Sequence, residues 1–346
     1  MQFKTPPPPH FVSYNSVSQV MLQVIYALIP GSLAMIWYFG WGILINMLIA
    51  VTAAVGAEAG MLLIRKRPLR RFLGDYSAIV TGWLLALALP PLTPWWLTMV
   101  GILFAIIIAK HLYGGLGFNP FNPAMIGYVV LIVSFPVQMT LWTPPEMLTE
   151  INFNLFQSAS IIFTGQLPHN LSWDAVTMAT PLDTMRTQLG LNLTIEEIGE
   201  SPLWGDFGGR GWEWIGNWYL LGGGWLIYKR VIGWQIPMGM LGGLIAIATL
   251  FYLADPDTHP FPAFHMFSGG ALLGAFFIAT DPVTASTTPK GRLIYGAGIG
   301  CLVFIIRTWG GYPDGVAFSV LLMNLAVPAI DYYTKPRVYG QGLDGP

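Results

Sequence analysis

The chain has 346 residues, of which 54% are apolar and only 10% are charged, and its formal net charge is −1. Soluble domains carry about 25% charged residues, so this composition excludes an ordinary soluble protein. A net charge of −1 also excludes the basic face that nucleic-acid binding needs. The single cysteine, Cys301, excludes an internal disulfide and an iron–sulfur cluster held by this chain alone.

Residues 1–19 form a Pro-rich polar tail without the short apolar region and cleavage site of a signal peptide. Long apolar stretches follow, and a transmembrane helix needs about 20 mostly apolar residues. Ten such stretches lie near 20–38, 41–63, 76–92, 95–110, 124–141, 213–229, 233–254, 264–280, 293–309 and 315–332.

The spans predict an all-α polytopic membrane protein of about ten transmembrane helices. Five spans (20–141) precede a long segment (142–212), five more follow it (213–332), and residues 333–346 form a tail. An odd number of spans in each half allows a 5+5 inverted repeat, although the residues themselves show no convincing repeat.

Basic residues mark the cytoplasmic side of a membrane protein. The stretch "IRKRPLRR" (64–71) follows the second predicted span. When this stretch is placed in the cytoplasm, 13 of the 16 Lys and Arg residues fall on that side. Both chain ends are then cytoplasmic, and residues 142–212 form a large external loop.

The external loop carries eight acidic side chains and two basic ones. At about 70 residues it is too long for a simple connection, and connections of that length are usually functional or disordered. We predict a short helix at "TIEEIGES" (194–201), with Thr194 as its N-cap and Glu197 completing a capping box.

Two polar stretches lie at the cytoplasmic ends of spans, "KHLYGGLGFNPFNPAMIGY" (110–128) and "ATDPVTASTTPKGR" (279–292). In the first, glycines allow close backbone approach, and Asn122 and Pro123 begin a helix whose free N–H groups suit an anion or a polar rim. In the second, Asp281 is an ionisable residue at membrane depth, which makes it a functional candidate. A turn that satisfies its own backbone and a helix cap at Asp281 remain the alternatives.

A third polar stretch, "TWGGYPDGVAFSVLLMN" (308–324), lies at an external turn before the last span. Asp314 and Gly315 there suit a turn or a helix cap.

Residues 174–180, "DAVTMAT", place two hydroxyls in the external loop. The stretch resembles the flavinylation signal Asp-x-x-Ser/Thr-x-Ala-Thr, in which a flavin transferase joins FMN, donated by FAD, through its phosphate to the last threonine. The resemblance implies covalent FMN on Thr180, with Asp174, Thr177 and Ala179 as recognition residues. Met178 departs from the signal, where Gly or Ser is commoner. The alternative is a surface turn with ordinary threonines.

Further blocks extend the resemblance over about residues 20 to 340. They are "PGSLAMIWYFGWG", "LALPPLTPWW", "AKHLYGGLGFNPFNPAMIGYVVLIVSFPVQMT", "ATPLDT", "GAFFIATDPVTASTTPKGRLIYGAG", "GGYPDGVAFSVLLMN" and "IDYYTKPRVYG". Together they resemble the D subunit of the Rnf (Rsx) ion-translocating electron-transport complex. They are similar, more distantly, to the B subunit of the sodium-pumping NADH:quinone reductase.

The resemblance implies a flavin-bearing subunit of a translocase-type oxidoreductase complex in the bacterial inner membrane, not active alone. Such a subunit relays electrons between NADH and ferredoxin or a similar acceptor, coupled to movement of Na⁺ or H⁺. Its expected partners are the other Rnf membrane, iron–sulfur and second covalent-FMN subunits, with a flavin transferase for maturation. No catalytic residue, metal site or nucleic-acid partner is predicted for the chain itself.

The resemblance also implies a second, non-covalent flavin, riboflavin, inside the membrane portion. The polar groups available for it near the inner helix ends are Gly114, Gly115, Asn119, Asn122, Asp281 and Thr284.

Composition alone also permits an ion or solute transporter without a cofactor of its own. Four carboxylates near the inner ends of spans are candidates for an ion path, or else caps and interfacial groups: Glu58, Asp75, Asp281 and Asp331. The residues decide neither the coupled ion nor the physiological electron acceptor.

Overall fold

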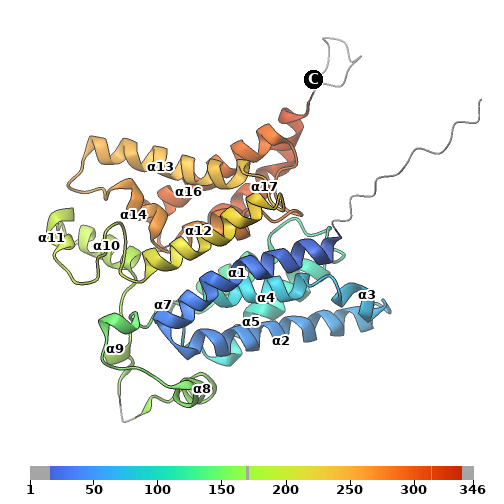
Figure 1. Ribbon diagram of the computed structural model, residues 1–346, viewed down its shortest axis with the longest axis horizontal. Helices are drawn as coiled ribbons and strands as arrows, with labels where there is room; N and C mark the ends of the chain where they lie inside the picture. The colour runs from blue at the N-terminus through green and yellow to red at the C-terminus, as the bar shows by residue number, and fades with distance from the viewer. Residues whose placement is uncertain (1–15, 169–170, 313, 337–346) are drawn as a thin grey trace, which may run out of the picture.

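A computed structural model describes residues 16–168, 171–312 and 314–336. The regular elements within these ranges are helices (Figure 1). The first half contains α1 (Val17–Phe39), α2 (Trp41–Ile64), α3 (Leu69–Leu73), α4 (Ser77–Ala88), α5 (Trp95–Leu103), the π-helix η1 (Phe104–His111), α6 (Pro123–Ser134) and α7 (Pro136–Thr140). The middle segment contains η2 (Glu146–Leu148), α8 (Leu155–Thr164), α9 (Trp173–Val176), α10 (Pro181–Gly190) and α11 (Ile195–Gly199). The second half contains α12 (Trp212–Tyr228), α13 (Gln235–Ala254), α14 (Pro262–Phe267), α15 (Ala271–Leu273), the π-helix η4 (Gly274–Ile278), α16 (Pro289–Trp309) and α17 (Val316–Thr334).

Five helices in the described ranges are long and apolar enough to cross a membrane: α1, α2, α13, α16 and α17. The prediction of an all-α, multi-pass membrane protein is confirmed at this level. The other five predicted spans also contain helix, but their helices are shorter or interrupted.

Two of the predicted spans are not continuous helices. In the stretch predicted at 124–141, helix α6 ends at Ser134 and helix α7 begins at Pro136. The helix is interrupted there because proline lacks the N–H that would continue the backbone hydrogen bonds. The stretch predicted at 264–280 breaks after Phe267, and Gly269 there adopts a left-handed backbone with φ of +61°.

The helix cap considered at Asp281 is not formed. The chain turns at Asp281, whose carboxylate accepts bonds from the Val283 N–H (3.3 Å) and the Thr284 hydroxyl (2.9 Å). Helix α16 begins later, at Pro289, where the Thr288 hydroxyl accepts the Gly291 N–H (3.0 Å). The predicted start of a helix at Asn122 and Pro123 is confirmed, with the Asn122 side chain accepting the Met125 N–H at 3.3 Å.

Glycines allow the helices to approach closely. Helices α1 and α12 lie side by side (Figure 1), and a Cβ on Gly222 would lie 2.1 Å from the Ala27 carbonyl oxygen. Helices α13 and α16 form an equally close pair, in which a Cβ on Gly243 would lie 2.6 Å from the Ala297 oxygen and one on Gly300 would lie 2.1 Å from the Met240 oxygen. Such small-residue contacts are typical of membrane helix pairs.

The helices of the middle segment gather at one end of the molecule. Figure 1 shows α8 to α11 at the end opposite α3 and opposite the first turn of α1 and the last turn of α17. The predicted capping box of α11 is present, with the Glu197 N–H donating to the Thr194 hydroxyl (3.4 Å) and the Thr194 N–H donating to Glu197 (2.8 Å). These bonds from Thr194 hold the pKa of Glu197 below its usual value.

Candidate functional site

Thr180 is the N-cap of α10. Its hydroxyl accepts the Asp183 N–H at 3.3 Å, and Pro181 occupies the first helical position, where no N–H is needed. Two residues of α10, Leu182 and Met185, are buried against Ile198 of α11 and Phe264 of α14. This small apolar cluster fixes the start of α10 on the second half of the molecule.

The residues before Thr180 connect it to the first half. The Met178 N–H donates to the carbonyl of Trp142, which follows α7, at 2.8 Å. The Thr177 hydroxyl donates to the Trp173 carbonyl at 2.8 Å, and it is half-buried, whereas Asp174 and Ala179 are exposed. The predicted recognition residues therefore lie on an accessible turn, and Thr180 lies where that turn enters the body of the protein.

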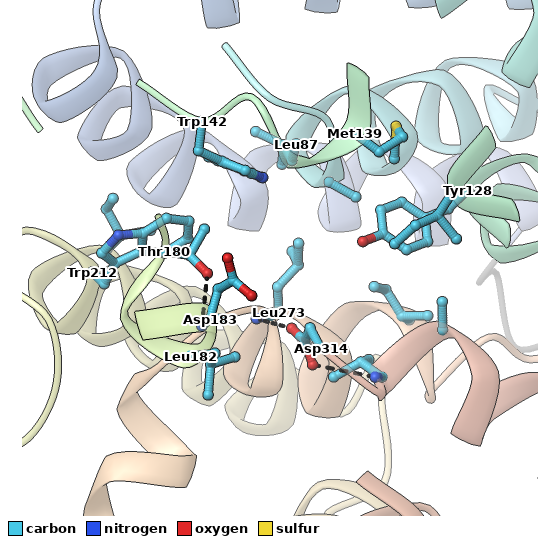
Figure 2. A pocket seen from close by; sticks show the side chains of 18 of the residues that line it. Leu87, Tyr128, Met139, Trp142, Thr180, Leu182, Asp183, Trp212, Leu273 and Asp314 are labelled. Atoms are coloured by element: carbon cyan, nitrogen blue, oxygen red, sulfur yellow. Dashed lines mark hydrogen bonds between the residues drawn. The ribbon is translucent and has the colours of Figure 1, made fainter. Parts of the chain in front are cut away.

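A cavity of about 120 Å³ opens beside Thr180, and we call it the Thr180 cavity. Figure 2 shows Met139 and Tyr128 of the first half, and Trp142 just after α7, facing Thr180, Trp212 and Asp314 across it. The lining comes from α1, α4, α6 and α7 of the first half, from Trp142 and the start of α10 in the middle segment, and from α12, the 269–278 stretch and the start of α17 in the second half. The full set is Met35, Leu87, Ala88, Met125, Tyr128, Ile132, Met139, Thr140, Trp142, Thr180, Pro181, Leu182, Asp183, Trp212, Ile215, Tyr219, Gly269, Gly270, Leu273, Ile278, Asp314, Val316 and Ala317. The cavity thus lies between the two halves.

The wall of the Thr180 cavity is mainly aromatic and apolar, with few polar groups. The rings of Trp142 and Trp212 lie 5.0 Å apart, and both contact Phe39. The hydroxyl of Tyr219 is buried and has no hydrogen-bond partner among the described residues. Apolar walls with a few converging polar groups are typical of sites for small organic molecules and cofactors.

The residues fit a flat aromatic group attached to Thr180. A cavity of about 150 Å³ accommodates benzene, so this cavity of about 120 Å³ takes at most one edge of a fused ring system. The rest of the ring system can pack against the aromatic rim formed by Trp142 and Trp212. The unpartnered Tyr219 hydroxyl supplies a donor for a polar ring edge.

A second cavity, of about 90 Å³, lies at the other end of α4, and we call it the Asn122 cavity. Three of the predicted riboflavin residues, Asn119, Asn122 and Asp281, line it. The Asn119 side-chain oxygen is buried without a partner among the described residues, whereas Asn122 donates to the Ile278 carbonyl at 3.2 Å. A free acceptor beside a partly apolar wall fits the polar edge of a ring.

The other three predicted riboflavin residues lie outside this lining. Thr284 reaches it only through its bond to Asp281. Gly114 and Gly115 form the preceding turn, where their φ angles of +133° and +105° require glycine.

Lys110 is one of the 13 basic residues that the predicted topology places on the cytoplasmic side, and it begins the polar stretch 110–128. In the structure it lines the Asn122 cavity and is buried, with 1% of its surface exposed. Its ammonium group donates to both carboxylate oxygens of Glu58 (2.8 and 2.6 Å) and to the Ser77 hydroxyl (2.7 Å), which satisfies all three of its protons. His111 also lies near Glu58, with Nε2 3.5 Å from the carboxylate. One of the four candidate carboxylates is therefore paired in the interior.

The remaining two carboxylates near inner helix ends hold turns. Asp75 accepts bonds from the Ser77 N–H and hydroxyl (2.8 and 2.6 Å). Asp331 accepts bonds from the Ser286 hydroxyl and from the Thr287 N–H and hydroxyl. These contacts join the loop after η4 to the end of α17.

Sequence reasoning missed most of the Thr180 cavity. The aromatic and polar lining from other helices was not singled out: Tyr128, Trp142, Trp212 and Tyr219. Asp314 was assigned to a turn or cap, and it does accept the Val316 N–H at 3.3 Å, but it also lines the cavity. No local sequence pattern predicts that these residues share a cavity, because they come from four separate segments.

Comparison with known proteins gives the family. A model of the NQR2, RnfD, RnfE family matches residues 4–340. The chain belongs to this family. It is 55% identical over 339 residues to the D subunit of the ion-translocating oxidoreductase complex of Vibrio cholerae serotype O1, a match that covers 96% of this chain and 97% of that protein. It is 54% identical over 341 residues to the D subunit of the same complex from Aliivibrio salmonicida, again covering 96% and 97%.

A third D subunit of this complex, from Aeromonas salmonicida, is 54% identical over 330 residues, covering 93% of this chain and 94% of its own length. These matches confirm the predicted relationship to the D subunit of the Rnf complex over nearly the whole chain.

Proposed function

We propose that this chain is a flavin-bearing membrane subunit of an ion-translocating oxidoreductase complex, with FMN joined through its phosphate to Thr180. The observation that carries the proposal is the position of the Thr180 hydroxyl, on an accessible turn and at the mouth of an aromatic cavity. The names of its relatives support the assignment of the chain to an ion-translocating oxidoreductase complex. When bound, the flavin supplies one- and two-electron redox chemistry, and the protein supplies its position and surroundings.

We further propose that the complex relays electrons between NADH and ferredoxin or a similar acceptor, coupled to Na⁺ or H⁺ movement. Its partners are the other membrane, iron–sulfur and covalent-FMN subunits, and a flavin transferase matures this chain. The chain crosses the bacterial inner membrane ten times in two halves of five spans, with both termini cytoplasmic and residues 142–212 external. The grouping of α8 to α11 opposite α3 and its arginines supports this topology (Figure 1).

The residues of the Asn122 cavity support a second flavin, riboflavin, near the cytoplasmic side. The hydrocarbon core of a membrane is about 30 Å thick, so electrons that pass between the external flavin and cytoplasmic partners need a carrier at membrane depth. The free Asn119 oxygen and Asp281 are the groups that would hold it. Because these groups line one cavity of this chain, they support a riboflavin site within it.

Attachment is tested with Thr180→Ala and Thr177→Ala in cells that contain the flavin transferase. We expect Thr180→Ala to remove the covalent flavin and Thr177→Ala only to weaken it, because the Thr177 hydroxyl is already used by the Trp173 carbonyl. Flavin fluorescence after denaturing electrophoresis and mass spectrometry of the 174–186 peptide provide the measurement. An adduct on Thr177 rejects Thr180 as the attachment residue. A wild-type chain with no adduct rejects the covalent flavin and leaves a transporter without a cofactor.

The same Thr180→Ala preparation tests the second flavin. We expect denaturation to release a flavin without phosphate, identified by chromatography, from the purified variant. If the whole complex yields none, the inner carrier belongs to a neighbouring subunit and the Asn122 cavity holds only helix ends together.

A further inference from the structure

Arg307 is a buried cation outside the attachment loop that the proposed function does not yet use. It lies near the end of α16, and 2% of its side chain is exposed. Its guanidinium donates to Asp314 Oδ1 (Nε at 3.2 Å and Nη2 at 3.1 Å), to the Ser268 carbonyl (3.0 Å) and to the His265 carbonyl. It therefore ties the start of α17 to the break between α14 and α15.

Asp314 links Arg307 to the Thr180 cavity. Its second carboxylate oxygen accepts the Gly270 N–H at 2.7 Å, and Gly269 and Gly270 line the cavity. Its side chain is 21% exposed and also lines the cavity, where Figure 2 shows it among the residues of the second half. Arg307 and the backbone thus hold one side of the Asp314 carboxylate, and the other side of the carboxylate faces the Thr180 cavity.

The Asn122 cavity has a comparable arrangement. Lys110 lies near the end of the helix formed by α5 and η1, as Arg307 lies near the end of α16. Each cation is buried and pairs with a carboxylate. Each also bonds the end of a shorter element, Lys110 through the Ser77 hydroxyl and Arg307 through the Ser268 backbone carbonyl. A buried ion pair is weak evidence for stability, because desolvation offsets the attraction. Because a buried ion pair occurs beside each of the two cavities, we infer that the pairs serve the cavities rather than overall stability.

We propose that Arg307 and Asp314 are the positioning pair of the Thr180 cavity. Arg307 holds the Asp314 carboxylate and the 268–270 break in place. Of the two carboxylates that line the cavity, Asp183 and Asp314, the pair therefore presents Asp314 fixed and partly neutralised to the flavin ring attached through Thr180. This proposal rests on the proposed function. It adds two residues that neither the attachment signal nor the family match assigns.

The charge of the pair gives the expected direction. A negative charge beside a ring opposes electron uptake, and the effect is larger in a low-dielectric site than in water. Asp314→Asn keeps the shape of the side chain and removes this charge, so it raises the midpoint potential of the flavin. Arg307→Met leaves the carboxylate uncompensated and releases the 268–270 break, so it lowers the potential. Arg307→Lys keeps the charge and shifts the potential less than Arg307→Met.

The experiment uses the purified full-length chain. During a redox titration, the spectrum of Thr180→Ala is subtracted from that of each other variant, and the difference reports the covalent flavin alone. Denaturing electrophoresis measures how much flavin is attached. The controls are Asp206→Asn and Arg210→Met, which make the same charge changes at exposed positions of the external loop outside the Thr180 cavity.

We expect attachment like the wild type in all variants, and a shift of potential only in those of Arg307 and Asp314. If Arg307→Met does not accumulate, Asp314→Asn and Arg307→Lys decide the question. Potentials and spectra equal to those of the controls overturn the inference while leaving attachment intact. A wild-type chain without covalent flavin rejects the proposed function, and the inference with it.

Discussion

The Lys110 ammonium has three acceptors in the interior, and only 1% of the residue is exposed, which ties its burial to Glu58. Removing one partner of a buried pair costs roughly 3–5 kcal/mol because the other charge is left uncompensated. Lys110→Met is therefore expected to lower the thermal unfolding midpoint of the purified chain strongly, and Lys110→Met with Glu58→Gln to recover part of the loss.

Lys229→Met is the matched control, because Lys229 is exposed near a helix end and lacks such a carboxylate contact among the described residues. Thermal scans in detergent compare the three variants. A Lys110→Met protein as stable as Lys229→Met would show that the burial of Lys110 is not coupled to Glu58.

Residue patterns predicted local features well and contacts between distant residues poorly. The N-cap at Asn122 and the capping box at Thr194 depend on neighbours within three positions, so the sequence contains all the information. The partners of Lys110 lie 52 and 33 positions away, and Arg307 reaches across 39 positions to Ser268. Only the packing of helices brings these groups together.

Among the helices, the close pair α13 and α16 depends on glycines. A Cβ on Gly243 would lie 2.6 Å from the Ala297 oxygen, whereas one on the neighbouring Gly242 meets nothing within 4 Å. Overpacking costs about 1–3 kcal/mol. Gly243→Ala should therefore lower the yield of monodisperse protein after mild heating, and Gly242→Ala should not, as size-exclusion chromatography can show. Equal yields would mean that α13 and α16 separate easily.

Helix positions followed from hydropathy because long apolar stretches have few alternatives in a membrane. The interruptions did not, since hydropathy does not distinguish a continuous helix from one that breaks at Gly269 or at Pro136. The breaks place Gly269 and Gly270 at the Thr180 cavity, so the part that sequence reasoning missed is the part that shapes the site.

At the scale of the whole molecule, the proposed topology predicts which loops face each side of the membrane. In a Cys301→Ala background, a cysteine at position 201 should react with an impermeant maleimide in intact spheroplasts, and one at position 69 should not. Ser201 and Leu69 are both half-buried, so the comparison reports the side of the membrane rather than exposure. The reverse labelling would overturn the ten-span topology and the external position of Thr180.

Helix α4 connects the two cavities. It contributes Leu87 and Ala88 to the Thr180 cavity, and Ser77, Val80, Thr81 and Leu84 to the Asn122 cavity. Because an α-helix rises about 1.5 Å per residue, the ten steps from Ser77 to Leu87 span roughly 15 Å. The number of residues in this one helix therefore sets the separation of the two cavities, which is about half of the roughly 30 Å thickness of a membrane core.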